Sequence, residues 1–394
     1  MSTMTGGRAA RPRPHIALLL ALALAALLLV AAGCGGDDEG SSGAGAGAST
    51  SANLNEAQKL LQQYETRPTQ INQDQPIDKP IPAGKKIAFI SCGPASCLEF
   101  GKILEPAAKT LGWSTQIITT DGSPEKMQNA IESAIRTHAD AIYLPATDSN
   151  ALGASIEKAR KAGIVFAACC SLATAPPLSG PDKGDDVDYN VSTPKQNGPI
   201  GDALAAKVVA DSKGDANALY VNISAFQILA EVGNRFESKY KELCPDCKLD
   251  ELEVPLTALG KDVPDRVISK LRSNPDINYL VLSEASALYP GLSAAMKAAG
   301  LADKVKIVGR GGDSTVYEGV KSGDIKALVP PEHYSYDYAI LDALARKWAG
   351  VPVQETEPNV WMVTPDTIPD TGGAAVFPSV EDYQQQWAAL WGKS

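Results

Sequence analysis

Short apolar runs alternate with amphipathic stretches over most of the chain, and this alternation predicts the fold. Each run is roughly four to eight residues long, which suits a strand buried on both faces of a sheet. The expected strands are residues 86–90, 114–119, 140–144, 163–168, 216–223, 249–254, 279–282, 305–308 and 325–329. The stretches between them predict helices over residues 98–111, 225–243, 263–273 and 285–299, and one that ends at Lys161. Such alternation predicts parallel sheets with right-handed crossovers.

One further helix has a marked start. Ser123 is followed by Pro124, a favoured pair for the N-cap and the first helical position. Met127, Ile131 and Ile135 then recur at helical spacing, so one face of this helix is expected to be buried.

The rhythm of strands and helices stops after residue 168 and restarts at residue 216, which predicts two lobes of similar architecture. A chain of 394 residues also exceeds one ordinary core, and 44% hydrophobic with 21% charged residues is typical of a soluble globular protein. We therefore expect an α/β fold with two doubly wound parallel-sheet lobes.

The N-terminus has the features of an export signal. Arg8, Arg11 and Arg13 precede an apolar run over residues 16–32, and small residues lead directly to Cys34. The sequence Ala31-Ala32-Gly33-Cys34 resembles a bacterial lipoprotein cleavage site, which implies a signal peptide over residues 1–33 and a lipid on Cys34. A plain transmembrane anchor or an ordinary secretory signal are the alternatives.

Residues 34–84 are expected to form an appendage. Residues 35–52 are rich in Gly, Ser and Ala and predict a disordered tether. Apolar residues at helical spacing from Leu54 to Tyr64 predict a short amphipathic helix, and residues 67–84 predict an extended strap.

The net charge excludes one class of partner. The formal charge is −10, and it becomes about −13 without residues 1–33, which carry three arginines and no acidic residue. A surface this acidic repels nucleic acid, so we expect no nucleic-acid partner.

The six cysteines after Cys34 fall into three close pairs. An exported chain matures where disulfides are permitted. Cys92 and Cys97 follow a strand, where a disulfide would either shape a ligand site or simply staple a loop. Cys169 and Cys170 end another strand and would either bond to each other or pair with Cys92 or Cys97.

The third pair, Cys244 and Cys247, has the spacing of a redox motif. Redox chemistry favours a cysteine at the start of a helix, but this motif follows a helix, so a structural staple is the favoured interpretation. We expect no metal, because His138 and His333 lie far along the chain from any cysteine pair. Nothing in the sequence indicates a cofactor or a pair of nucleophile and base.

The order of several segments resembles type I periplasmic binding proteins of the ribose-binding kind. These segments are residues 85–91, Thr147-Asp148-Ser149, residues 162–165, Val308-Gly309 and residues 319–323. The resemblance covers roughly residues 85–350. It implies two lobes joined by three crossing segments, with ligand bound between them beyond the carboxyl ends of the strands.

The same resemblance implies domain limits and a function. The N-lobe would comprise residues 85–191 plus 332–358, and the C-lobe residues 192–331 plus 359–394. The protein would be a monomer outside the bacterial cell membrane, anchored to it by lipid, that passes a small-molecule ligand to an ABC transporter permease. A sensory receptor subunit of the same fold and a thiol oxidoreductase are the alternatives.

Residues at the positions of the family's sugar clamps differ here. Relatives have charged, amide or aromatic side chains at these positions, and this chain has Ser96, Cys97, Cys170, Ser171, Ala230, Glu284 and Gly311, with Pro331 or Glu332 near the last crossing. Fewer fixed hydrogen-bonding partners would suit a ligand with more apolar surface than a simple pentose or hexose.

Several other residues are candidates for ligand contact. Arg310 and Asp313 lie in a glycine-rich turn after a strand; the alternatives are a charge at the rim of the site and a helix cap. Tyr334, Tyr336 and Tyr338 lie near the last crossing and would either stack on ligand or pack in the hinge. Two weaker aromatic candidates follow C-lobe strands: Phe226 and Tyr289.

Overall fold

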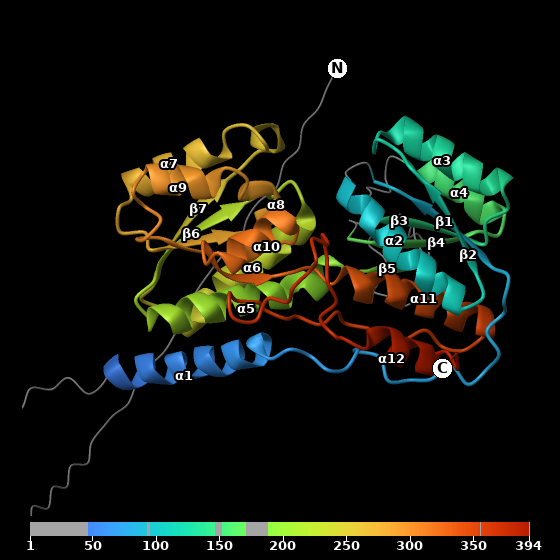
Figure 1. Ribbon diagram of the computed structural model, residues 1–394, viewed down its shortest axis with the longest axis horizontal. Helices are drawn as coiled ribbons and strands as arrows, with labels where there is room; N and C mark the ends of the chain where they lie inside the picture. The colour runs from blue at the N-terminus through green and yellow to red at the C-terminus, as the bar shows by residue number, and fades with distance from the viewer. Residues whose placement is uncertain (1–45, 93–94, 146–151, 171–187, 355, 394) are drawn as a thin grey trace, which may run out of the picture. The chain divides into compact units, whose positions relative to one another are not determined.

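The computed structural model describes residues 46–92, 95–145, 152–170, 188–354 and 356–393 (Figure 1). Two separate sheets of five strands each are present in this part of the chain, and every strand pairing within them is parallel. The predicted α/β class with two parallel sheets is confirmed.

The N-lobe sheet has the strand order β2-β1-β3-β4-β5. Its strands are β1 (Lys86–Ile90), β2 (Ser114–Ile118), β3 (Ala141–Pro145), β4 (Val165–Cys169) and β5 (Tyr189–Val191). Helices α3 (Pro124–Arg136) and α4 (Gly153–Lys161) cover one face of the sheet. Helices α2 (Ala95–Thr110), α11 (His333–Ala349) and α12 (Tyr383–Leu390) contribute to the core on the other face.

The C-lobe sheet has the strand order β10-β9-β8-β6-β7. Its strands are β6 (Asn217–Asn222), β7 (Lys248–Glu253), β8 (Tyr279–Leu282), β9 (Lys306–Arg310) and β10 (Ile325–Val329). One face packs against α1 (Ala46–Glu65), α5 (Pro194–Ser212) and α6 (Gln227–Leu243). The other packs against α7 (Val263–Ser273), α8 (Ala285–Leu288), α9 (Leu292–Ala298), α10 (Ser314–Lys321) and the short 3₁₀ helix η2 (Leu256–Ala258).

Two local predictions are wrong, and a third is confirmed in part. Helix α1 begins at Ala46, inside the segment expected to be a disordered tether. Ser123 is the predicted N-cap residue and the helix begins at Pro124, but the Ser123 hydroxyl donates to Asp121 and makes no capping bond. The single helix expected over residues 285–299 is two helices, since Pro290 and the left-handed Gly291 separate them.

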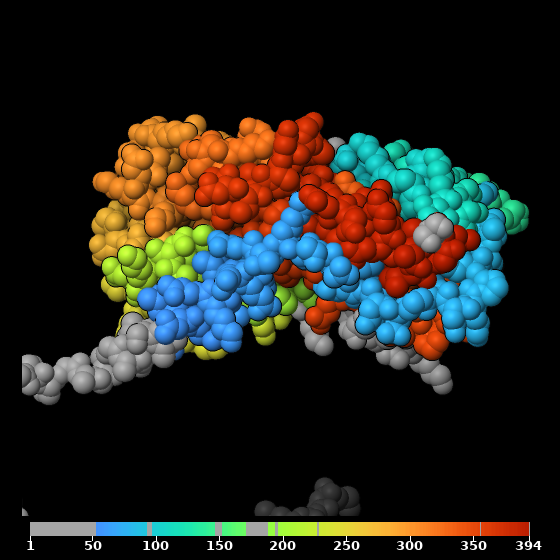
Figure 2. Space-filling view, turned by 60° about the horizontal axis from the view of Figure 1, so that its bottom comes forward, coloured from blue at the N-terminus to red at the C-terminus, as the bar shows by residue number. Residues whose placement is uncertain are grey.

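The first and last described segments of the chain lie side by side across one face of the molecule, where Figure 2 shows them in blue and red. Ala57 and Leu61 of α1 are buried in the C-lobe core, while Ile71, Ile77 and Ile81 of the following strap are buried in the N-lobe core. The strap therefore connects the cores of both lobes.

The C-terminal tail was expected to belong to the C-lobe, but its packing is divided. Trp361 and Phe377 are buried in the C-lobe core. Trp387 of α12 and Trp391, directly after it, pack in the N-lobe core. The Trp391 ring stacks on Tyr338 with centroids 5.6 Å apart. Tyr338 thus has the hinge-packing role that was the alternative to ligand stacking.

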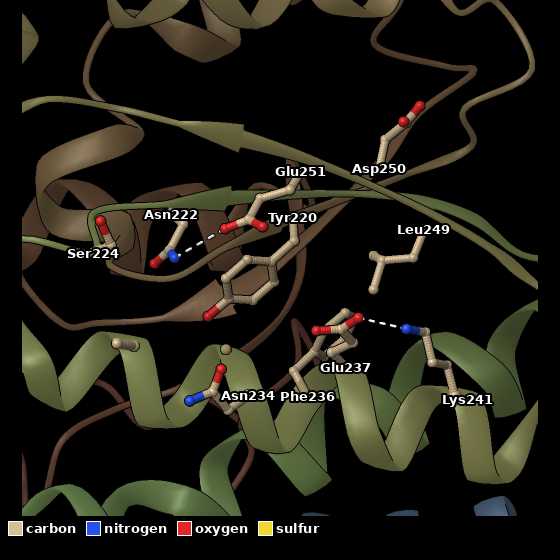
Figure 3. Close-up of a pocket in the computed structure, with 12 residues that line it drawn as sticks. Tyr220, Asn222, Ser224, Asn234, Phe236, Glu237, Lys241, Leu249, Asp250 and Glu251 are labelled. Carbon is tan, nitrogen blue, oxygen red and sulfur yellow. Dashed lines mark hydrogen bonds and ion pairs between the residues drawn. The ribbon is translucent and has the colours of Figure 1, made fainter. Parts of the chain in front are cut away.

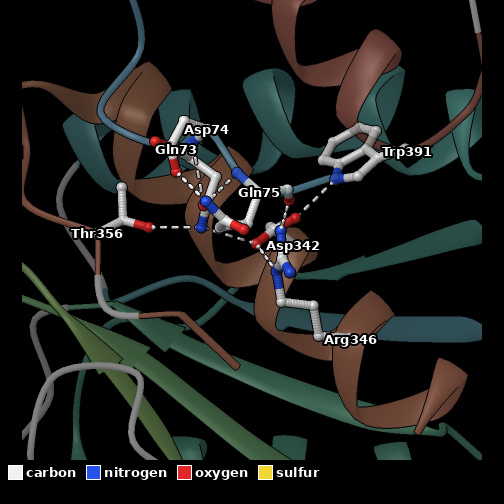
Figure 4. Close-up of polar contacts among 7 residues, drawn as sticks. All are labelled: Gln73, Asp74, Gln75, Asp342, Arg346, Thr356 and Trp391. Atoms are coloured by element: carbon white, nitrogen blue, oxygen red, sulfur yellow. Dashed lines mark hydrogen bonds and ion pairs between the residues drawn. The ribbon is translucent and has the colours of Figure 1, made fainter. Parts of the chain in front are cut away.

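A buried ion pair holds the strap, α11 and the tail together (Figure 4). Arg346 and Asp342 lie one turn apart on α11, 2.6 Å apart, and their side chains are only 3% and 2% exposed. Asp342 also accepts a hydrogen bond from the Trp391 indole at 3.0 Å and one from Gln73 of the strap at 3.4 Å. Arg346 also donates to the backbone carbonyl of Gln75.

Removing one member of this pair should destabilise the protein strongly. Asp342→Ala leaves the Arg346 guanidinium buried without its counter-charge, so we expect a loss of about 3–5 kcal/mol in the free energy of unfolding. Urea unfolding would measure it, and limited proteolysis should show faster cleavage of the tail. Glu157→Ala, which removes an exposed ion pair with Lys161 on α4, is the matched control and should change little. If both substitutions had a similarly small effect, the buried Asp342–Arg346 pair would not have the stabilising role described.

Candidate ligand site

Residues from both lobes interact at the carboxyl ends of the two sheets. The N-lobe contributes Cys170, directly after β4, and Ser192, directly after β5. The C-lobe contributes Glu284, after β8, and Arg310, the last residue of β9. Arg310 and Glu284 both interact electrostatically with Cys170, so the ends of the two sheets meet here.

Arg310 forms a buried ion pair with Glu284. The Arg310 residue is 6% exposed, and burial raises the pKa of Glu284 although the guanidinium opposes that shift. Gly311 makes room for this pair: its φ is +132°, and a Cβ there would lie 2.5 Å from Glu284 Oε1. A glycine is therefore required at this position.

The start of α11 adds aromatic and acidic groups to the same place. The His333 ring packs against Phe100 with centroids 4.4 Å apart, and burial lowers the pKa of His333 to about 3. Its imidazole is therefore neutral at physiological pH. Tyr336 is buried and interacts with Cys170, Ser192 and Arg310. The fully buried Asp337 accepts a hydrogen bond of 2.8 Å from Tyr143.

Cys169 and Cys170 are adjacent thiols at this junction. Their sulfur atoms lie 3.2 Å apart and are not bonded, and Cys170 has a left-handed φ of +56°. The alternative pairing of either cysteine with Cys92 or Cys97 is excluded, because Cys92 and Cys97 are bonded to each other. Cys244 and Cys247 form the predicted staple between α6 and β7.

Buried polar atoms without a partner gather around these residues. Among the described residues they include Arg310 Nε, His333 Nδ1, Asp337 Oδ2 and the Ser283 hydroxyl. An unsatisfied buried polar group costs about 1–3 kcal/mol, so each of these atoms needs a partner from outside the chain, either water or a bound molecule.

A pocket of about 320 Å³ lies between α6 and strands β6 and β7 (Figure 3). Tyr220 and Asn222 of β6 line it, and the Tyr220 hydroxyl and Asn222 Oδ1 are two further buried atoms without a partner. The Asn222 amide donates to Glu251 at 3.1 Å. Ala230 also lines the pocket.

The structure brings some of the predicted site residues together and gives the others separate roles. Those that it brings together are Cys170, Glu284, Arg310 and Tyr336. Asp313 caps α10 by accepting a 2.9 Å hydrogen bond from the Val316 amide, Phe226 is 47% exposed at the start of α6, and Tyr334 packs against Tyr383. The Cys92–Cys97 disulfide joins the end of β1 to α2, and Tyr289 is buried in the C-lobe core.

Some predictions fall elsewhere, and some residues were missed. Cys34, Thr147-Asp148-Ser149 and Ser171 lie outside the described residues, as does the side chain of Ser96. Ser192 and Asp337 were not predicted. Asp337 follows His333 at a spacing of four residues on a helix start, which is the signal that would have indicated a shared location.

Comparison with known proteins identifies the family. The profile of the periplasmic binding protein domain matches residues 97–351, about two thirds of the chain. The chain belongs to the periplasmic binding protein family. Proteins of this family bind solutes and are not enzymes, which confirms the expected solute-binding function.

Individual relatives are distant. The D-apiose import binding protein of Paraburkholderia graminis is 26% identical over 223 residues, which cover 56% of this chain and 67% of the relative. An ABC sugar transporter subunit of Rhodobacter sphaeroides has a similar structure, with a TM-score of 0.58, 20% identity, and coverage of 72% of this chain and 99% of the other. A 5-methylthioribose transporter protein of Thermotoga lettingae has a TM-score of 0.60, 17% identity, and coverage of 80% and 99%.

The described residues hold neither a candidate membrane span nor a metal cluster. None of their helices is both long and apolar enough to cross a membrane. No three of their histidine, cysteine, aspartate and glutamate side chains converge as metal ligands would.

The neighbours Glu332 and His333 should give opposite pH dependences. Burial raises the pKa of Glu332 to about 7, so its contribution to stability is full below about pH 4.5 and is lost as pH rises through 7. His333, with its pKa lowered to about 3, contributes fully above about pH 6.5, and that contribution is lost as pH falls. Between about pH 6.5 and 4.5 the two nearly cancel.

Single substitutions should expose each contribution. His333→Phe leaves only the Glu332 contribution, so its free energy of unfolding should rise relative to the wild type as pH falls from 6.5 to 4.5. Glu332→Gln leaves only the His333 contribution, so its free energy of unfolding should fall over the same range. Each change should reach up to about 1.4 kcal/mol per pH unit. Urea unfolding at pH 7.5, 5.5 and 4.5 measures these slopes. Wild-type slopes in both variants would show that neither group is buried as described.

Proposed function

We propose that this chain is the solute-capturing subunit of an ABC importer and that its ligand is a small sugar with an apolar substituent. The proposal rests on one observation: buried, unpartnered polar atoms from both lobes gather where the carboxyl ends of the two parallel sheets meet. Ligands of doubly wound α/β proteins bind at such edges. The family assignment and the import function named for the P. graminis relative support it.

The chemistry of the site favours a partly apolar ligand. Arg310 and neutral His333 offer hydrogen bonds at a few fixed points, whereas Phe100, Tyr336 and the two cysteines offer apolar or weakly polar surface. A fully hydroxylated hexose needs more fixed partners than these. The similar T. lettingae protein was solved with 5-methylthioribose, a sugar that carries an apolar group.

A thermal-shift panel tests the ligand class. We expect 5-methylthioribose, or an aromatic or cyclic apolar compound, to raise the melting temperature, because ligand at a hundredfold excess over Kd stabilises by about 2.7 kcal/mol. Ribose, glucose and galactose should give no shift at millimolar concentration. Arg310→Ala should abolish the ligand-induced shift.

Asp313→Ala is the matched control. It removes only the cap of α10, at a cost of about 0.5–2 kcal/mol, and should leave the ligand-induced shift intact. A clear shift with a common free sugar that disappears in Asp313→Ala would contradict the proposed ligand class. That result would mean that Asp313 binds an ordinary sugar.

The proposed location is the outer face of the bacterial cell membrane, with lipid on Cys34. We expect Cys34→Ala to move the protein from the membrane fraction into the medium or periplasm, since the lipid on Cys34 is the proposed anchor. Immunoblotting of fractionated cells measures this, with the wild type as control. If the variant remained wholly in the membrane fraction, the lipid-anchor proposal would be wrong.

A further inference from the structure

Adjacent cysteines at a site that binds solute can react with each other, in addition to the weakly polar surface that they offer to a ligand. Cys169 is fully buried and Cys170 is half-buried, and their sulfur atoms are 3.2 Å apart. The two other cysteine pairs in the described chain are already disulfides. Among the described cysteines, Cys169 and Cys170 are therefore the pair that is reduced, whereas the other two pairs are oxidised.

The backbone holds this pair in an unusual conformation. Cys170 has φ +56° and Ser192, at the end of the neighbouring strand β5, has φ +59°. A left-handed conformation is unfavourable for residues other than glycine and persists only where the surroundings impose it. Here the Cys170 amide donates to the Val191 carbonyl at 3.0 Å and Asn197 donates to the Ser192 hydroxyl at 2.9 Å, which fixes both residues.

The groups around the two thiols differ in a way that assigns each a role. Hydrogen bonding with Cys169 lowers the pKa of Cys170, and Ser192 and Arg310 act in the same direction. Burial raises the pKa of Cys169. Cys170 is also the more exposed of the two thiols, which suits it to act as the nucleophile and Cys169 to act as the resolving thiol.

A proton acceptor for Cys169 is also present. The Asp337 carboxyl is fully buried and interacts with Cys169, and one of its oxygens, Oδ2, has no partner. Its other oxygen accepts a 2.8 Å hydrogen bond from Tyr143, which fixes its position. In its ionised form, a carboxyl whose burial raises its pKa is a stronger base than an exposed carboxylate, so the Asp337 carboxylate takes a proton from a thiol more readily.

We propose that Cys169 and Cys170 form a reversible disulfide that controls the ligand site, with Asp337 as the proton acceptor. The Cys170 thiolate attacks a small disulfide such as oxidised glutathione, whose S–S bond breaks and releases one glutathione thiolate. Cys169 then gives its proton to Asp337, and its sulfur attacks Cys170 and expels the second glutathione. Two cysteine thiols are oxidised and one glutathione disulfide is reduced to two thiols.

The consequence for ligand affinity rests on the proposed function. The reduced Cys170 sulfur interacts with the Arg310 guanidinium, most strongly when it is ionised, and the disulfide carries no such charge. The oxidised form should therefore bind ligand about tenfold more tightly, the effect expected of one hydrogen bond to a charged group.

The disulfide itself is tested without ligand. The exported, full-length protein is reduced, treated with oxidised glutathione, alkylated and mapped by mass spectrometry. We expect the peptide with Cys169 and Cys170 to lose two hydrogens, and the reduced wild type to bind one equivalent of phenylarsine oxide more than the Cys170→Ser variant does. Cys169→Ser should stop at a glutathione adduct on Cys170. A stable adduct in the wild type, or bonds from this pair to other cysteines, would overturn the proposal.

Asp337→Asn tests the proton acceptor separately. It keeps an acceptor for the Tyr143 hydroxyl, so the fold should be retained, which near-UV circular dichroism would verify. We expect the glutathione adduct to form at the wild-type rate but to resolve at least tenfold more slowly around neutral pH. Unchanged resolution in a folded variant would remove Asp337 from the reaction.

Titration of 5-methylthioribose into both forms tests the effect on affinity. Tighter binding to the oxidised form, absent in Cys170→Ser, supports the proposal, and equal Kd values for both forms overturn it. If neither 5-methylthioribose nor D-apiose binds either form, the proposed ligand class fails. The mapping experiment decides the disulfide independently of that outcome.

Discussion

The burial of helix α11 is the constraint on which much of this structure depends. All residues from Tyr336 to Arg346 are buried, although the helix carries Asp337, Asp342 and Arg346 within that stretch. A charged group without a partner in such a position costs several kcal/mol. Each therefore has a dedicated partner: Tyr143 of β3 for Asp337, and the strap, the tail and each other for Asp342 and Arg346.

This constraint explains the appended ends of the chain. The strap and α12 cover the side of α11 that faces away from the N-lobe sheet, and they supply Gln73, Trp391 and the Gln75 carbonyl to its charged pair. The strap begins at α1, which packs on the C-lobe, and the tail contributes residues to the cores of both lobes. The strap and the tail therefore link the lobes in addition to the crossing segments. Movement of the lobes must then be accommodated by these ends.

The strands were predictable because each is a short apolar run with clear limits. Strands β8 and β10 and helix α7 have the predicted bounds. Helix α5 was missed, although Thr193 and Gln196 form a capping box around Pro194 that marks its start. Helix α12 was missed because its apolar residues, such as Trp387, serve the neighbouring α11 and follow no pattern of their own.

The site was predictable only in part. Cys170, Glu284 and Arg310 follow strand ends, and parallel topology brings such positions to one edge. Their partners depend on three-dimensional packing: no sequence pattern pairs Arg310 with Glu284, or Asp337 with a tyrosine almost two hundred residues away. The alternation of tyrosines at Tyr334, Tyr336 and Tyr338 suggested one common role, but on a helix these side chains point in different directions, and only Tyr336 faces Cys170.

The unpartnered atoms also bear on how binding is coupled to movement. Arg310 Nε belongs to the C-lobe sheet and His333 Nδ1 to the start of α11, so a ligand that satisfies both must contact both lobes. A ligand shifts an equilibrium only by its differential affinity for the two states. When the lobes are apart, a ligand can contact the unpartnered atoms of only one lobe, so it binds more tightly when the lobes are together. In the empty site these atoms stay unsatisfied, and that free-energy cost is what makes closure of the lobes depend on the solute.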